Sequence, residues 1–573
     1  MARILRGALI LLIVVLGLAG AAGFALYQSW NPAPPAAQVF YNGPVLTMNG
    51  TNDIAEAVLV EGGQISLVGT QAEIVAAAPE NAIMHDLAGK ALLPGFIDAH
   101  GHYPGWGVMS VALNLSSPPV GTVQSIDEIK AMIAAKVATV SPGTWIVGMG
   151  YDDTLVAEMR HPTAADIDEV APENPVGIIH VSGHMTVVNT RAMQEMAVTA
   201  DTPDPDGGEI VRDTAGQPTG LMKETASYIF RDKLLGFGPA DIATLLRAGN
   251  QDYLTKGVTT AQNGLANEAM FVPLGWLSRI GYMPIRIVSL VEAEYALALQ
   301  QQGKLFDLES DKYHIAGVKI VTDGSIQGYT GFLGKPYFVP HAGHGPDYRG
   351  YPIYQKDALN DLVARSMQTG LRPYMHGNGD ASIDMILDAV EQGQAVAPKM
   401  RDAWPVIIHA QMMRSDQIAR AKTLSVSPSF FNAHVYYWGD RHRDIFMGPE
   451  RAARMSPMNE ALRAQLPFTL HLDTPIVPMD PWVMVWSAVE RRTSSGQQLG
   501  PDQRIGLMQA IRGTTIDAAW QAGLGEKTGS IEQGKWADLI IVDQDPRAAD
   551  DLREIKTLST FVGGVEQFNA ATQ

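Results

Sequence analysis

The chain has 573 residues, of which 46% are hydrophobic and 18% charged, so it is long enough for a large core and more than one domain. Its formal net charge of -18, without runs of Lys and Arg, argues against a nucleic-acid partner. The chain contains no cysteine, which excludes disulfides, thiolate metal ligands, a cysteine nucleophile and a lipidated N-terminal cysteine. Any bound metal must therefore use His, Asp, Glu or a modified Lys.

The N-terminus carries Arg3 and Arg6 before an uncharged apolar run from Ala8 to Leu26. The run is short for a membrane-spanning helix and long for a signal-peptide core, and the small residues 19–21 offer a cleavage site. A cleaved signal peptide, a retained anchor in the inner membrane and a buried helix are all compatible with this pattern. Because the arginines stay on the cytoplasmic side, we expect residues 1–37 to direct the rest of the chain to the periplasm or another extracytoplasmic space.

Short strand-like segments occur at both ends of the remaining chain. Residues 57–69 contain two apolar segments joined at a Gly-Gly turn, and residues 529–542 and 560–564 are apolar segments between glycines. These segments form either two separate β units or one shared unit. Each group alone would have little core, which favours the shared unit.

Between these ends, short apolar strands alternate with helical stretches such as residues 382–392 and 415–422. The predicted strands are residues 91–99, 257–261, 284–290, 317–321, 372–376, 405–409, 424–428 and 468–473. Repeated βα units with nearly continuous apolar strands indicate a parallel sheet, and eight such units close a TIM barrel. Residues 103–255 are too many for one βα connection, so they are predicted to form an inserted subdomain.

The first of these strands ends in Asp98-Ala99-His100-Gly101-His102. Because side chains alternate along a strand, His100 and His102 lie on the same side and can reach one point at its carboxyl end. Imidazole is the commonest biological zinc ligand, so this point suits a metal ion, with Asp98 placed to orient the pair. A His-x-His pair taken alone is equally compatible with a structural role.

The last polar residues of four other predicted strands are Lys319, His376, His409 and Asp473. Active sites of TIM barrels lie at the carboxyl ends of the strands, so these side chains are expected to meet the histidine pair. A single buried histidine is more often structural, and Asp473 could instead cap the turn before Pro475. Their shared position at strand ends nevertheless favours a metal site.

These segments resemble a known superfamily. Pro94-Gly-Phe-Ile-Asp-Ala-His-Gly-His102 resembles the first metal-binding strand of the amidohydrolase superfamily, and later segments resemble its amidohydrolase-3 branch, the YtcJ-like metal-dependent hydrolases. His376-Gly-Asn-Gly-Asp380 and Ile408-His-Ala-Gln411 resemble the segments that carry the fifth- and sixth-strand ligands. Leu472-Asp-Thr-Pro475 resembles the segment of the eighth-strand aspartate. The resemblance covers about residues 39–568.

The resemblance implies the architecture of the whole chain. We expect a TIM (β/α)8 barrel at residues 93–489, with the insert at about residues 103–255 after the first barrel strand. Residues 38–92 and 490–570 are expected to combine into one small β-sandwich formed by both chain ends.

The resemblance also implies a divalent metal, expected to be zinc, as one or two ions. The implied ligands are His100, His102, Lys319, His376, His409 and Asp473. A protonated lysine has no lone pair, so Lys319 could bind metal only after carbamylation, as implied by its segment Val318-Lys-Ile-Val-Thr-Asp-Gly-Ser325. With the carbamate the site could hold two ions, and without it one ion beside a free lysine.

Asp473 is implied as the catalytic residue that accepts a proton from the attacking water. His184, in Val181-Ser-Gly-His184, is implied as a substrate-binding residue, and further candidates for the pocket wall are Trp106, Tyr329 and Phe332. Among the other histidines, four that match no ligand segment are expected to be structural or pocket residues: His180, His314, His434 and His471. The sequence departs from the branch pattern just before His409 and at Leu472, which leaves the substrate open.

The function predicted from these residues is that of a metal-dependent hydrolase acting on a carbon-nitrogen bond, as in a small-molecule amide. Ester or lactone hydrolysis and ring deamination use the same site and remain alternatives. A non-catalytic binding protein tethered to the membrane is the alternative from another class.

Overall fold

The computed structural model describes residues 32–340 and 345–572. The predicted export segment from Ala8 to Leu26 lies outside these residues. Within them, no helix combines the length and the apolar character needed to cross a membrane.

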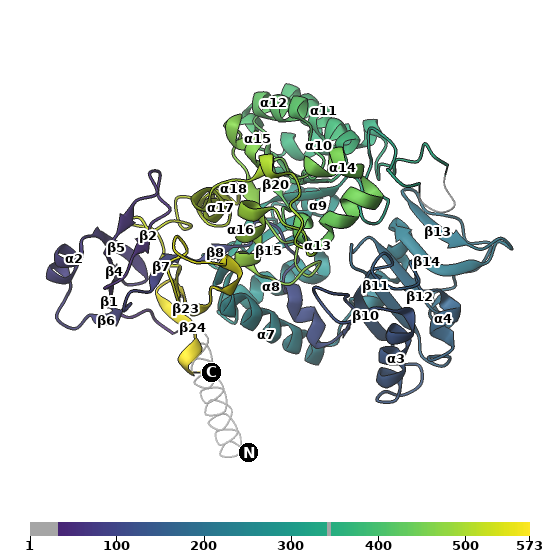
Figure 1. Cartoon of the computed structure of the whole chain (residues 1–573), viewed down its shortest axis with the longest axis horizontal. Coiled ribbons are helices and arrows are strands. Elements are labelled where there is room, and N and C mark those ends of the chain that lie inside the picture. Colours follow the sequence, from purple (N-terminus) through teal and green to yellow (C-terminus); the bar gives the residue numbers. More distant parts are fainter. Residues whose placement is uncertain (1–31, 341–344, 573) are drawn as a thin grey trace, which may run out of the picture.

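A sheet of eight parallel strands forms the centre of the molecule (Figure 1). In sheet order the strands are β8 (Phe96–Ile97), β15 (Val258–Ala266), β16 (Arg286–Glu292), β17 (Tyr313–Val321), β18 (Pro373–Gly377), β19 (Val406–His409), β20 (Ser427–Phe430) and β21 (Thr469–Leu470). Beyond the ends of the two outer strands, Asp473 N donates to His100 O and His102 N donates to Thr474 O. These bonds close the sheet, and the predicted TIM barrel is confirmed.

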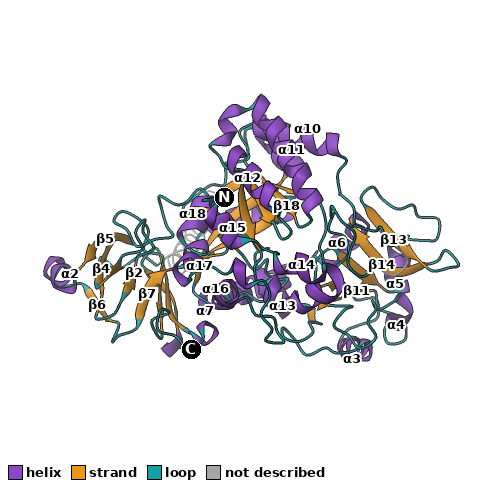
Figure 2. Cartoon of the chain, turned by 45° about the horizontal axis from the view of Figure 1, so that its top comes forward, coloured by secondary structure: helices purple, strands orange, loops and turns teal. Residues whose placement is uncertain are grey.

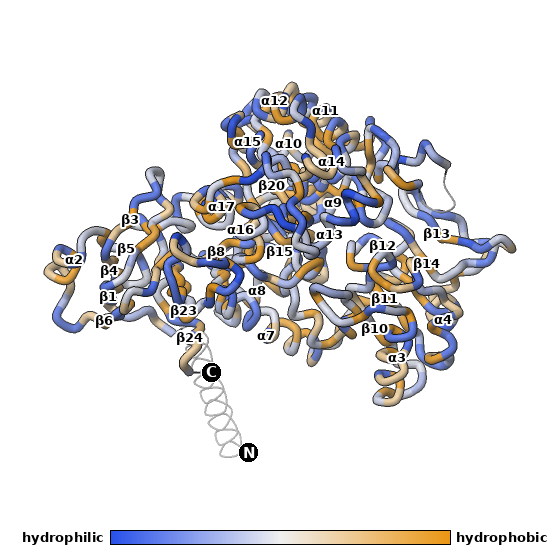
Figure 3. The backbone as a smooth tube through the Cα atoms, in the orientation of Figure 1, coloured by the Kyte–Doolittle hydropathy of each residue, from blue (hydrophilic) through white to orange (hydrophobic). Residues whose placement is uncertain are grey.

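Helices between the strands cover the outside of the barrel (Figure 2). Among them are α10 (Lys356–Gln368), α11 (Asp380–Val396) and α12 (Ser415–Leu424). Hydrophobic and hydrophilic residues alternate along α11 and α12 (Figure 3), as expected for helices with one buried face. The buried residues of α11 recur at helical spacing, and they include Ile383, Ile386, Leu387 and Val390. The helices predicted at residues 382–392 and 415–422 are therefore confirmed.

The predicted seventh strand, residues 424–428, starts too early. Helix α12 extends to Leu424, and Ser425 ends it in the left-handed conformation with a φ of 52°. Strand β20 then begins at Ser427. Leu424 is buried as the last residue of the helix, so its apolar character alone did not distinguish the two elements.

Two sheets form the sandwich at the left of Figure 1. One contains β5 (Gln64–Gly69), β4 (Ala57–Glu61), β1 (Ala37–Tyr41) and β6 (Ile83–Asp86). The other contains β24 (Val565–Asn569), β23 (Thr557–Val562), β22 (Leu539–Val542), β7 (Ala91–Pro94), β2 (Val45–Leu46) and β3 (Ile54–Ala55). Strand β22 pairs antiparallel with β7, and Phe40 packs edge-on against Phe561 with ring centroids 5.1 Å apart. Both chain ends therefore share one core.

The insert forms a mixed six-stranded sheet at the right of Figure 1. Its strands are β13 (Gly208–Arg212), β14 (Pro218–Glu224), β12 (Met185–Val188), β11 (Val176–His180), β10 (Ile146–Tyr151) and β9 (Leu113–Asn114). Helices α3 (Ile126–Val137), α4 (Ala164–Asp168) and α5 (Thr190–Glu195) belong to this region. Helix α7 (Pro239–Thr255) then leads back into β15 of the barrel and contacts it.

Candidate active site

The structure brings together five of the predicted site residues at the carboxyl ends of the barrel strands. We call this set the mouth cluster: His100, His102, His376, His409 and Asp473. Asp473 lies at its centre, because its Oδ1 is 3.5 Å from His100 Nε2 and 3.3 Å from His102 Nε2. Its Oδ2 is 3.9 Å from His409 Nε2, and the rings of His376 and His409 lie 4.4 Å apart between centroids.

The atoms of this cluster suit a cation. Ligand atoms of His100, His102 and Asp473 all lie within 4.8 Å of one another. Although two imidazole nitrogens are close to it, the buried Oδ1 of Asp473 has no hydrogen bond of acceptable geometry to the described residues. Oxygen and nitrogen lone pairs facing a common point fit the donor set of a divalent metal such as zinc.

His100 is held from behind by an amide. Its Nδ1 lies 2.7 Å from Oε1 of Gln262, whose Nε2 donates to Ala99 O at 2.8 Å. Because the carbonyl of Ala99 needs the NH2 group, the oxygen of Gln262 must face His100, which therefore carries its hydrogen on Nδ1. The lone pair of His100 Nε2 is thereby turned toward Asp473.

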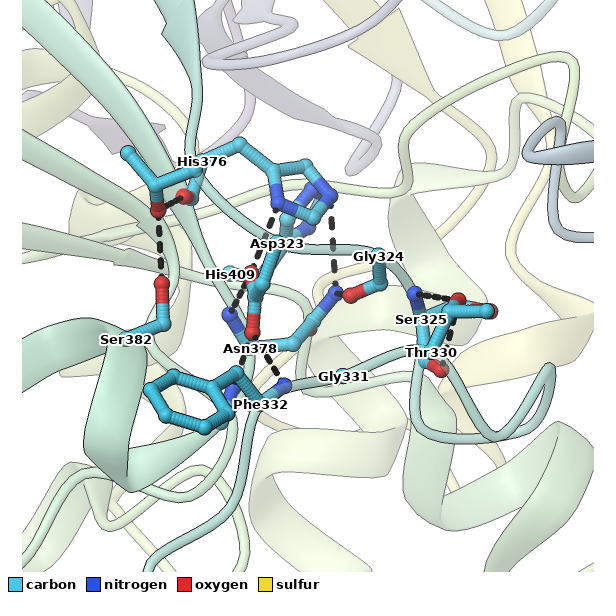
Figure 4. Close-up of polar contacts among 12 residues, drawn as sticks. Asp323, Gly324, Ser325, Thr330, Gly331, Phe332, His376, Asn378, Ser382 and His409 are labelled. Carbon is cyan, nitrogen blue, oxygen red and sulfur yellow. Dashed lines mark hydrogen bonds and ion pairs between the residues drawn. The ribbon is translucent and has the colours of Figure 1, made fainter. Parts of the chain in front are cut away.

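His376 is held by a carboxylate (Figure 4). Its Nδ1 lies 3.1 Å from Oδ1 of Asp323. The two oxygens of this carboxylate also accept hydrogen bonds from the backbone N–H groups of Phe332, Asn378 and Gly379. Burial raises the pKa of Asp323 to about 7, although these N–H groups oppose the shift. Asp323 thus fixes the ring of His376 and belongs to the site.

Burial also keeps three of the imidazoles neutral. It is the largest influence on His100, His376 and His409, and it lowers the pKa of each well below its usual value. Burial raises the pKa of Asp473, but the imidazoles of His102 and His100 beside its carboxylate more than offset this and hold the pKa below its usual range. Neutral imidazoles beside an ionised carboxylate are the protonation states that metal binding requires.

Lys319, near the carboxyl end of β17, is buried beside this cluster. Its Nζ lies 3.1 Å from His100 Nε2, and the residue is only 3% exposed. Burial lowers the pKa of the ammonium to about 7. The structure therefore brings the sixth predicted residue next to the other five.

His184 comes from the insert and reaches the barrel mouth. Its Nδ1 lies 2.8 Å from Oε2 of Glu224, and its ring is 5.1 Å from that of His376. Burial lowers the pKa of His184, but the adjacent Glu224 more than offsets this effect and raises it. His184 therefore lies where a group bound at the mouth cluster would meet it.

Glu224 is packed tightly against the barrel. It is 1% exposed, and it has a φ of 48°, a backbone conformation that is costly for a glutamate. A Cβ on Gly324 would come within 2.2 Å of Glu224 Oε1, so the approach requires glycine at this position. His409 and Asp473 also have positive φ values, of 71° and 57°. Strain of this kind is typical of functional sites.

The remaining predictions have mixed outcomes. Asp98 has Tyr253 as its side-chain hydrogen-bond partner, at 3.3 Å, rather than either histidine of the pair. Tyr329 packs against Tyr337 and Phe446 in an aromatic cluster, whereas Phe332 lies beside Asp323. Trp106 lies in the short helix Gly105–Ser110 that follows the histidine pair.

Four residues hold side chains of this region in place by hydrogen bonds, and the sequence did not predict that role for them: Gln262, Asp323, Glu224 and His471. Asp323 stands within the segment that indicated Lys319, so its spacing from the lysine was the available signal. His471 was expected to be structural or to line the pocket, and its Nε2 lies 3.1 Å from His409 Nδ1. Gln262 lies in β15 and Glu224 in β14, and the sequence pattern of these strands does not indicate contact with the mouth cluster.

Known proteins are similar to this chain in sequence and in fold. Residues 84–567 match the Amidohydrolase family. An N-substituted formamide deformylase from Arthrobacter pascens is 30% identical over 543 residues, covering 92% of this chain and 97% of that protein. YtcJ of Bacillus subtilis (strain 168), which bears an amidohydrolase name, is 27% identical over 546 residues, covering 92% and 98%.

A solved structure, an uncharacterized metal-dependent hydrolase from Pyrococcus horikoshii OT3, has a TM-score of 0.70 and 24% identity. The match covers 90% of this chain and 98% of that one, and it shows a common fold. The family match spans most of the sequence. This chain is a hydrolase that belongs to the amidohydrolase family.

Proposed function

We propose that the protein is a metal-dependent hydrolase that cleaves a carbon-nitrogen bond of a small-molecule amide with water. One observation carries the proposal: the Nε2 atoms of His100, His102 and His409 surround the carboxylate of Asp473, whose Oδ1 has no hydrogen bond to the described residues. Such a group of inward lone pairs is costly to bury unless a cation occupies it.

The proposed ligands are the mouth cluster and, when carbamylated, Lys319. A divalent ion held there, expected to be zinc, would lower the pKa of a water and polarise the scissile carbonyl. Carbamylation would give Lys319 an anionic oxygen beside His100, so that two ions could share the site. Without it, one ion and a free amine remain.

Asp473 and His184 divide the remaining work. Asp473 is ionised and central, so it accepts the proton of the attacking water and passes it to the leaving amine. His184 comes from the insert, where Glu224 orients its ring, and it contacts the substrate. The proton transfer to nitrogen matters because the nitrogen group leaves readily as a neutral amine and poorly as an anion.

The substrate proposal begins with N-substituted formamides, because the Arthrobacter pascens relative carries that name and aligns with nearly the whole chain. Ester or lactone hydrolysis and ring deamination need the same groups. A non-catalytic binding protein would need neither the ion nor the proton acceptor.

The test combines metal analysis with a substrate panel. Purified protein should contain one or two equivalents of zinc or a similar ion, and chelation should abolish hydrolysis until metal is restored. The panel comprises N-formyl amines, N-acyl amino acids, aryl amides, an ester and a lactone. Full activity in rigorously metal-free protein would overturn the proposal, and absence of both metal and turnover would favour the binding protein.

We also propose that residues 1–37 export the protein, supported by Arg3 and Arg6 before the apolar run. A reporter fused to residues 1–36 should cross the membrane. A reporter that remained in the cytoplasm would contradict export.

A further inference from the structure

Behind His409, the interior of the barrel is polar. Barrel interiors are usually filled by branched apolar side chains. Here a row of buried polar side chains runs from the mouth cluster toward the opposite end: His471, Ser429, Thr469, Gln521 and Ser427. Each of these residues is at most 2% exposed.

The row is a continuous chain of hydrogen-bonding contacts. His409 Nδ1 lies 3.1 Å from His471 Nε2, and His471 Nδ1 lies 2.9 Å from Ser429 Oγ. Thr469 Oγ1 lies 2.8 Å from both Ser429 Oγ and Gln521 Oε1. Gln521 Nε2 donates to Ser427 Oγ at 2.8 Å, and Ser427 Oγ donates to Pro467 O at 2.9 Å.

Which groups donate and which accept in this row of hydrogen bonds is set at the end farthest from His409. Pro467 O can only accept, so Ser427 gives it its single hydrogen and must accept from Gln521. The same NH2 group also donates to Pro428 O at 3.3 Å. Reversing the amide would place its oxygen against that carbonyl. Gln521 Oε1 is therefore fixed toward Thr469.

The remaining hydrogens follow from counting one per hydroxyl. Thr469 Oγ1 is placed to donate to both Gln521 Oε1 and Ser429 Oγ, but it carries only one hydrogen. Gln521 Oε1 has no hydrogen of its own, so Thr469 donates to it, and the hydrogen between Thr469 and Ser429 must come from Ser429. Ser429 Oγ then accepts from His471 Nδ1. His471 then presents a lone pair at Nε2, which accepts the hydrogen on His409 Nδ1. The lone pair of His409 is left on Nε2, the atom that faces Asp473.

We propose that His471 is a positioning residue, and that the chain from Ser427 to His471 fixes the tautomer of His409 for metal binding. This inference rests on the proposed function. Gln262 and Asp323 perform the same task for His100 and His376 as single residues. The carboxylate of Asp323 can only accept, and Ala99 O fixes which end of the Gln262 amide faces His100. An imidazole can likewise present either a hydrogen or a lone pair, so His471 needs partners that decide between the two.

The first test compares two amides at position 471. The amide of His471→Gln reaches the place of Nε2 and keeps an acceptor for His409, whereas that of His471→Asn reaches only the place of Nδ1. Zinc affinity, measured by chelator competition, should fall about 10- to 100-fold in H471N and clearly less in H471Q. Equal affinities of H471N and wild type would overturn the inference.

The second test removes a hydrogen bond of this row that does not involve His409 itself. Ser429→Ala leaves His471 Nδ1 without its acceptor and should weaken zinc binding, whereas Ser289→Ala is the matched control. Ser289 is equally buried in the barrel and donates to Tyr313 Oη at 2.9 Å, outside this chain. Both variants should lose thermal stability, and only S429A should lose zinc affinity. Equal zinc affinity in the two variants would contradict the proposed role.

A third measurement does not depend on bound metal. Nitrogen-15 NMR of histidine-labelled protein, with His471 assigned from the H471Q spectrum, should show hydrogen on Nδ1 in the metal-free wild type. Hydrogen on Nε2 would overturn the inference whether or not zinc binds. Failure of the wild type to bind zinc would overturn only the proposed function.

Discussion

The insert contains a second group of acidic and imidazole side chains whose ligand atoms lie as close together as those at the barrel mouth. We call it the insert cluster: Asp152, Asp153 and His180. Its hydrogen bonds differ from those of the mouth cluster. His180 Nε2 lies 3.1 Å from Asp153 Oδ1, and its Nδ1 lies 2.9 Å from Ser182 Oγ. Asp152 accepts from Trp438 Nε1 at 3.0 Å and from the Thr154 backbone.

The difference shows that proximity alone does not make a metal site. In the insert cluster both nitrogens of His180 are engaged by neighbouring protein groups, so the ring has no lone pair left for an ion. In the mouth cluster the Nδ1 atoms of His100 and His409 are engaged, and their Nε2 atoms face Asp473. We therefore expect substitutions in the two clusters to affect different properties, turnover and metal content in one and stability in the other.

The largest expected effect is that of Asp473→Asn at the mouth. Asparagine keeps the shape but cannot accept the proton, so kcat should fall about 10²–10⁴-fold. The matched substitution in the insert cluster, Asp153→Asn, should leave kcat within about threefold, below the range for a lost general base. Turnover and metal content are measured for both variants on one amide. A D473N enzyme with its metal and nearly full turnover would place the proton acceptor elsewhere, with His184 tested next.

Lys319→Ala should remove at least one bound ion and most of the activity, because the variant has no carbamate oxygen. Short carboxylic acids that occupy the vacated space should restore part of both. Lys223→Ala is the control, since Lys223 is also buried but pairs with Glu209 in the insert at 3.0 Å. Full metal content in K319A, measured by elemental analysis, would mean that Lys319 is a free amine.

Asp323→Asn tests an anchor that holds a ligand without touching the ion. The amide presents an NH2 group to the N–H donors around it, so the ring of His376 loses its fixed orientation. We expect metal affinity to fall about 10- to 100-fold. Chelator competition measures the affinity, and circular dichroism checks that the variant is folded. Unchanged affinity in a folded variant would show that His376 needs no anchor.

Glu224→Gln should separate orientation of the substrate from metal binding. Loss of one charge-assisted hydrogen bond to His184, about 1.5 kcal/mol, corresponds to roughly tenfold in rate. Metal content should stay at the wild-type value. Glu209→Gln, on the neighbouring strand, serves as the control. A parallel loss of metal in E224Q would assign Glu224 to the mouth cluster itself.

The smallest effect concerns the insert cluster and pH. Burial raises the pKa of Asp153, but His161 and His180 more than offset this, and the net shift is downward from 3.8. A carboxyl whose folded pKa lies below its unfolded value stabilises the protein above about pH 4, and this contribution disappears as the pH falls through the folded pKa.

Asp153→Asn should therefore lower the free energy of unfolding at pH 7 by about 2 kcal/mol and reduce its decline between about pH 4 and pH 2. Denaturant unfolding at several pH values measures both. An unchanged pH dependence would show that Asp153 contributes no linked stability.

The sequence predicted the residues that point inward at strand ends, because alternation and the barrel rule act on short segments. His100, His102 and Asp473 were found in this way. The anchors behind them were not, since Gln262 and His471 act through contacts between strands far apart in the chain. The start of β20 was missed for another reason: Leu424 is apolar in either element, and only the left-handed Ser425 separates helix from strand.

The hydrogen bonds between Asp473 and His100 and between His102 and Thr474 have a consequence for synthesis of the chain. The first and last barrel strands meet through residues of the mouth cluster, the proposed active site. A ribosome must therefore complete the eighth strand before the mouth cluster can assemble. Shortened products that end before Asp473 would keep several of the histidines yet remain inert, and recovery of activity during refolding should report the closing of the barrel.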